Sequence, residues 1–184
     1  MSAPKLSDVV EPSPLVEAYS TLTPGDYVGR LAPSLGMIME HELYNREILI
    51  SNEFLDTDTF LFITYLKPMA DVLKTVNDGL NSLHEVPLAV SLDQEMGFGK
   101  THFLTLLWHL YAQTYKWSEE TLINSRALLS EVKESGYKRA VAERTLVLAL
   151  DLISYPLGLD PYETIFESAA KLMELKRAST EPDP

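Results

Sequence analysis

The chain has 184 residues, of which 46% are hydrophobic and 23% charged, and this composition is typical of a globular chain of one domain. It contains no cysteine, which excludes disulfide bonds, cysteine-ligated zinc and thiol nucleophiles. The 15 basic and 27 acidic residues give a formal net charge of -12, which disfavours a direct nucleic-acid contact. Neither a signal peptide nor a membrane span is apparent, so the sequence predicts a cytoplasmic protein without membrane contact.

The first half of the chain is predicted to contain an arm, one helix and one strand. Residues 1–60 begin with a stretch rich in proline, serine and threonine, and they predict an N-terminal arm and irregular extension. Residues 61–178 form the predicted core, and residues 179–184 a polar C-terminal stub. From Pro68 onwards, apolar residues recur at spacings of three and four, which predicts a helix. Residues 88–92 are a short apolar run that predicts a buried strand.

The second half continues the alternation of helices and strands. Residues 101–115 predict a largely buried helix, and a further helix is expected from Ser118, as its cap, to Gly136, as its terminator. Residues 145–150 form the best strand candidate, and Asp160 is expected to cap the last helix. This order predicts an α/β fold, namely a partial P-loop nucleotide-binding core of parallel strands flanked by helices, with an N-terminal extension.

The residues between the first predicted strand and the next helix resemble the phosphate-binding loop Gly-x-x-x-x-Gly-Lys-Ser/Thr. The last three positions match, whereas Gln94 stands where the first glycine is usual. Gly97 and Gly99 permit close approach of phosphate oxygens to the backbone, and the start of the following helix presents N–H groups to them. We therefore expect nucleotide phosphates to be bound by Gln94, Glu95, Met96, Gly97, Phe98, Gly99, Lys100, Thr101 and His102. A structural turn without a ligand is the alternative.

The predicted cofactors are ATP and Mg²⁺. Lys100 is expected to place its charge on the β- and γ-phosphates, and Thr101 to offer its hydroxyl to Mg²⁺. Asp151 follows the second predicted strand and is either a second acid on the Mg²⁺ side or an ordinary strand end. Leu152 stands where a catalytic glutamate would follow, so no catalytic residue is assigned and these 184 residues alone are not expected to turn over ATP.

Two histidines lie on the helix that follows the loop. His102 and His109 are seven residues apart, which is about 10 Å along the axis, too far to share one metal ion readily. His102 is expected either to contact the loop or the base, or to be a packing histidine with internal partners.

Several of these segments together resemble a known family. They are Asp58-Thr59-Phe60, Thr64-Tyr65, and the run Gly97-Phe-Gly-Lys-Thr-His102 with the leucine-rich helix that contains His109. The resemblance covers about residues 25–170 and is to a family of large predicted AAA-type ATPases of archaea and bacteria, known as a domain of unknown function. It implies that this chain is the N-terminal part of an ATPase whose acidic strand, sensor strand and neighbouring arginine lie beyond Pro184.

The resemblance also implies the partners, which are nucleotide and either the remainder of a longer ATPase or another protein. A different class of function stays open. The chain would then be a non-catalytic interaction module with a degenerate loop, whose acidic surface and proline-rich arm dock a partner. A small-molecule kinase is disfavoured, because no arginine-rich lid follows Asp151.

Overall fold

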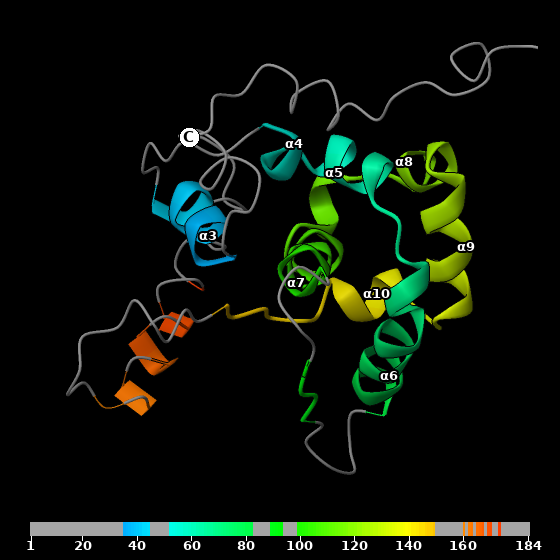
Figure 1. The fold of residues 1–184 in the computed structure, drawn as a ribbon. Helices are drawn as coiled ribbons and strands as arrows, with labels where there is room; N and C mark the ends of the chain where they lie inside the picture. The colour runs from blue at the N-terminus through cyan, green and yellow to red at the C-terminus, as the bar shows by residue number, and fades with distance from the viewer. Residues whose placement is uncertain are drawn as a thin grey trace, which may run out of the picture.

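The computed structural model describes residues 35–44, 52–82, 89–93 and 99–149, and several positions between 160 and 173. Figure 1 shows short helices gathered around α7 (Lys100–Leu107), which lies near the middle of the view. The remaining helical elements are α3 (Leu35–Tyr44), α4 (Asn52–Leu55), α5 (Thr57–Ile63), the 3-10 turn η2 (Lys67–Met69), α6 (Ala70–Asn81), the π-helical turn η3 (Trp108–Ala112), the 3-10 turn η4 (Thr114–Lys116), α8 (Glu119–Asn124), α9 (Arg126–Glu134) and α10 (Arg139–Ala142).

One hydrophobic core holds these helices together. Apolar side chains with no exposed surface come from α3, α5, α6, α7, η3 and α9, and they include Ile38, Phe60, Leu73, Leu106, Leu110 and Leu128. Burial of each such side chain contributes about 1.5–3 kcal/mol relative to exposure. Ile38 and Phe54 precede residue 60, so the chain on both sides of that position packs into the same core.

The predicted helix after Pro68 is confirmed as η2 followed by α6. Its apolar spacing has the expected result, because Met69 and Leu73 are buried on one side while Lys74 is exposed. No helix among the described residues is long and apolar enough to cross a membrane.

The predicted helix over residues 101–115 is confirmed in position but changes form along its length. α7 is regular, and the chain then widens at η3, where the Gln113 N–H donates to the carbonyl of Trp108, five residues earlier, at 3.2 Å. All five residues of η3 are buried. This segment therefore forms the central part of the core, as its nearly continuous apolar character indicated.

The prediction of an α/β fold is wrong for the part of the chain that the structure describes, because no strand occurs there. Residues 89–93 have no regular structure, and Val90 is 43% exposed. Residues 145–149 also lack strand structure, and Leu146 is 41% exposed. A strand needs a neighbouring strand for its backbone hydrogen bonds, and an apolar run cannot supply that neighbour. A P-loop core of parallel strands is therefore not the architecture of these residues.

The single helix expected from Ser118 to Gly136 is also wrong, because Ser125 divides it into α8 and α9. Ser125 is buried and has φ -96° and ψ 81°, outside the helical region. α8 packs against α5 while α9 packs against α6, so α8 and α9 contact different helices. Ser118 occupies the predicted cap position without a side-chain capping bond, and Gly136 follows the helix end with a φ of 77°.

The helix start predicted at Asp160 is confirmed. The N–H of Tyr162 donates to Oδ1 of Asp160 at 2.8 Å, and the described positions that follow are helical. Tyr162 and Phe166 are 72% and 71% exposed, and Met173 is 55% exposed. These three side chains therefore face outwards, whereas Ile165 and Ala169 are half-buried.

Candidate phosphate-binding helix start and its histidine support

The helix start that follows the glycine-rich loop lies within the described residues. Gly99 has φ 79° and ψ 16°, a left-handed conformation that glycine adopts without the strain other residues meet. Its carbonyl accepts the first helical hydrogen bond, from the N–H of Phe103 at 2.9 Å. Helix α7 then begins at Lys100, so Lys100 and Thr101 both lie on its first turn. The N–H groups of a first turn lack partners inside the helix and favour a negative group there.

The structure brings together only part of the predicted site. Gly99, Lys100, Thr101 and His102 are consecutive at the start of α7, with Thr101 exposed and Lys100 half-buried. Residues 94–98 and Asp151 lie outside the described residues, so their predicted contacts with phosphate and Mg²⁺ stay predictions.

His102 ties the first turn of α7 to the end of α5. Its Nε2 lies 3.1 Å from Oγ1 of Thr64, whose hydroxyl donates to the carbonyl of Phe60 at 2.6 Å. Because the only hydroxyl hydrogen goes to Phe60, the oxygen accepts from Nε2–H of His102. Burial lowers the pKa of His102, which favours the neutral ring. The imidazole next to the proposed phosphate contacts is therefore a positioning group rather than a positive charge.

His109 is completely buried two turns further along. Its Nε2 donates to the carbonyl of Phe54 at 2.9 Å, since a carbonyl can only accept. The hydroxyl of Thr57 donates to Oε1 of Gln113 at 2.7 Å, and its Oγ1 lies 3.0 Å from Nδ1 of His109. Desolvation by burial lowers the pKa of His109 to about 4, so the ring is neutral near pH 7.

Phe60 joins the two histidines. Its ring stacks on His102 with centroids 4.7 Å apart and on His109 with centroids 4.6 Å apart, at interplanar angles of 29° and 27°. Aromatic pairs of this kind contribute about 0.5–1.5 kcal/mol beyond their burial. The structure thus gives His102 the internal contacts expected of a packing histidine, which was one of the two alternatives for this residue. Within the described ranges, no three side chains of the types that ligate metals are grouped to hold an ion.

Both imidazoles are held by Thr57, Phe60 and Thr64, which lie on α5 and at its C-cap and for which the sequence predicts no role. A signal for them exists. Thr57, Phe60 and the C-cap Thr64 are spaced three and four apart and so lie on one side of α5, as His102 and His109 lie on one side of the segment formed by α7 and η3. Two helix faces with matching polar and aromatic residues are typical of two helices that pack against each other, but the sequence cannot show that these two faces meet.

A second polar network fixes the far end of the same helix. The hydroxyl of Tyr111 donates to Oδ1 of Asn77, and Nδ2 of Asn77 donates to Oγ of Ser135 at 2.9 Å. Burial raises the pKa of Tyr111, so its hydroxyl stays protonated. These bonds connect η3, α6 and α9, and they stabilise the helix that carries the candidate site.

Comparison of the chain with protein-family models, with curated proteins and with solved structures finds no match.

Proposed function

We propose that the chain binds the phosphates of ATP through residues 97–101, as the N-terminal part of a cytoplasmic AAA-type ATPase. The observation that supports this most is the start of α7, where a left-handed Gly99 is followed at once by Lys100 and Thr101 on the first helical turn. This arrangement would let phosphate oxygens approach the backbone, with one ammonium group and one hydroxyl beside them. Phosphate binding of this kind needs only the loop and the start of the helix, and it does not require strands among the described residues.

The proposed roles follow from the chemistry of each group. Lys100 supplies a full positive charge to the β- and γ-phosphates, and Thr101 supplies a hydroxyl to Mg²⁺. Asp151 is the proposed second acid on the Mg²⁺ side. The formal net charge of -12 opposes a polyanion over long range, but salt screens it beyond about 10 Å, so contacts at the loop dominate.

Isothermal titration calorimetry of ATP and AMP, each with Mg²⁺, tests the proposal. ATP is expected to bind more tightly than AMP, because only ATP carries β- and γ-phosphates. Lys100→Ala is expected to weaken ATP binding by about 1.5–3 kcal/mol, the loss typical of a hydrogen bond to a charged group.

Lys74→Ala is the matched control, since Lys74 is an exposed lysine on α6, another helix. It is expected to leave ATP binding unchanged. Equal affinities for ATP and AMP, or equal losses in Lys100→Ala and Lys74→Ala, would remove the basis for the proposal.

The second candidate is a non-catalytic interaction module. It is favoured by the helical architecture of the described residues and by a pocket between α8, α9 and the chain that leads into α10. If the calorimetry finds no ATP binding while the chain still associates through this pocket, the interaction module becomes the better assignment.

A further inference from the structure

A shallow pocket of about 330 Å³ lies on the surface between α5 and α8. It is lined by Asp58, Thr59 and Phe62 of α5 and by Thr121 and Asn124 of α8. The hydroxyl of Thr121 donates to Oδ1 of Asp58 at 3.0 Å, which fixes the carboxylate where the two helices meet. Phe62 follows Asp58 by one helical turn, on the same face of α5, and it is 52% exposed. The α5–α8 pocket thus combines a fixed carboxylate with an exposed aromatic ring.

The surface around the α5–α8 pocket is acidic. Asp56 caps α5 and Asp58 lies on its first turn, while α8 begins with Glu119 and Glu120, and all four side chains are exposed. Neither helix contains a basic residue. Lys116 precedes α8, but it does not line the pocket. The described residues that line this pocket therefore supply no cation to the carboxylate of Asp58.

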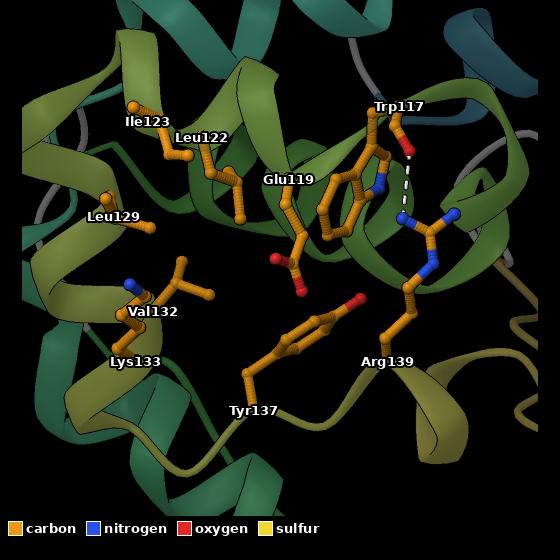
Figure 2. Close-up of a pocket in the computed structure, with 9 residues that line it drawn as sticks. All are labelled: Trp117, Glu119, Leu122, Ile123, Leu129, Val132, Lys133, Tyr137 and Arg139. Atoms are coloured by element: carbon orange, nitrogen blue, oxygen red, sulfur yellow. Dashed lines mark hydrogen bonds between the residues drawn. The ribbon is translucent and has the colours of Figure 1, made fainter.

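The pocket beside α8 and α9 shows how this fold binds a guanidinium group. Figure 2 shows Arg139 beside Trp117, and the guanidinium carbon lies 5.0 Å from the centroid of the Trp117 ring. The same guanidinium donates to the carbonyls of Trp117 and Thr114 at 3.1 and 2.9 Å, and it pairs with Glu143 at 3.1 Å. An aromatic face, oxygen acceptors and one carboxylate therefore surround a cation that the chain itself supplies.

The α5–α8 pocket offers the same kinds of group without the cation. Phe62 provides the aromatic face, Asp58 the carboxylate, and the side-chain oxygens of Thr59 and Asn124 are hydrogen-bond acceptors. A guanidinium group is planar, has five N–H donors and no acceptor, and stacks on aromatic rings. The ammonium group of lysine is a compact and strongly hydrated charge that does not stack in this way. The pocket therefore matches arginine better than lysine.

We propose that the α5–α8 pocket is a docking site for an arginine side chain of a basic protein partner. The guanidinium lies against the ring of Phe62 and donates to Oδ2 of Asp58, while Oδ1 keeps its bond from Thr121. The acidic residues at the starts of both helices attract further basic residues of the partner. The proposal is independent of ATP binding, because it uses no residue of the glycine-rich loop.

An NMR titration of the isotope-labelled chain with two blocked tripeptides, Gly-Arg-Gly and Gly-Lys-Gly, tests the proposal. Each tripeptide carries one positive charge, so the comparison separates recognition of guanidinium from general attraction to an acidic protein. The arginine tripeptide is expected to shift the amide signals of Asp58, Phe62 and Asn124 in a saturable manner. It is expected to bind at least about fivefold more tightly than the lysine tripeptide.

Two variants and one control identify the groups responsible. Asp58→Asn removes the charge but keeps an oxygen that accepts from Thr121, and it is expected to abolish the saturable shifts. Phe62→Ala is expected to reduce the affinity for the arginine tripeptide to that for the lysine tripeptide. Asp71→Asn is the matched control, because Asp71 is an exposed acid on the first turn of another helix, α6, and it should leave binding unchanged. Equal affinities for the two tripeptides, signal shifts away from α5 and α8, or equal losses in Asp58→Asn and Asp71→Asn would overturn the proposal.

Discussion

Acid is expected to destabilise the fold through His109. The folded chain holds this imidazole without exposed surface, with its Nε2–H on the carbonyl of Phe54 and its ring on Phe60. The unfolded chain exposes the same imidazole to water, where it takes up a proton near the ordinary pKa of 6.5. Below that pH the unfolded chain therefore binds a proton at His109 that the folded chain does not bind, and unfolding becomes more favourable.

The size of the effect follows from the two pKa values. The pKa of His109 falls from 6.5 in the unfolded chain to about 4 in the folded chain. At 1.36 kcal/mol for each unit, the difference amounts to about 3 kcal/mol. The contribution of His109 to the free energy of unfolding is fully present above pH 6.5. It decreases as the pH falls towards about 4, below which both the folded and the unfolded chain carry the proton. His102 adds a contribution of the same sign, since burial lowers its pKa as well.

Urea unfolding followed by circular dichroism, at pH values above 6.5 and near 4, measures this contribution. His109→Gln is expected to have a lower free energy of unfolding than the wild type at both pH values. On acidification from above pH 6.5 to near pH 4, however, the variant is expected to lose about 3 kcal/mol less of that free energy than the wild type does. The explanation fails if the wild type and His109→Gln lose equal stability on acidification.

Two predictions concern the support of the candidate site. Phe60→Ala is expected to lower the free energy of unfolding by about 3–5 kcal/mol, because the ring is fully buried and contacts both histidines. Phe62→Ala, at a position on α5 that is 52% exposed, should change it by less than about 0.5 kcal/mol, and equal losses in chemical denaturation would contradict the prediction. Gly99→Ala is expected to cost about 1–2 kcal/mol because the left-handed φ of 79° strains alanine, although the described part of the chain, apart from the residues next to Gly99, places no atom within 4 Å of the added Cβ. Gly99→Asn should cost less in the same assay, since asparagine tolerates this conformation, and equal costs would argue against backbone strain.

The sequence by itself determined those features that depend on neighbours along the chain. Apolar spacing located α6, the Gly-x-Gly-Lys order located the start of α7, and Asp160 marked the cap of the last helix. Gly136 was correctly identified as a terminator, and it has the left-handed φ that such a position requires. Each of these features arises within a few residues, from helix periodicity, side-chain capping or the freedom of glycine.

Tertiary structure alone decided the rest. The apolar runs near Val90 and Leu146 predict strands, but a strand forms only beside another strand, and no such partner exists among the described residues. Ser125 interrupts a segment for which the sequence predicts one helix, because α8 and α9 pack on different neighbours. The stack of Phe60 between His102 and His109 joins residues more than forty positions apart in sequence. Contacts of this kind are set by how the helices fit together in the core, and helix periodicity gives the face that each helix buries but not the partner that covers it.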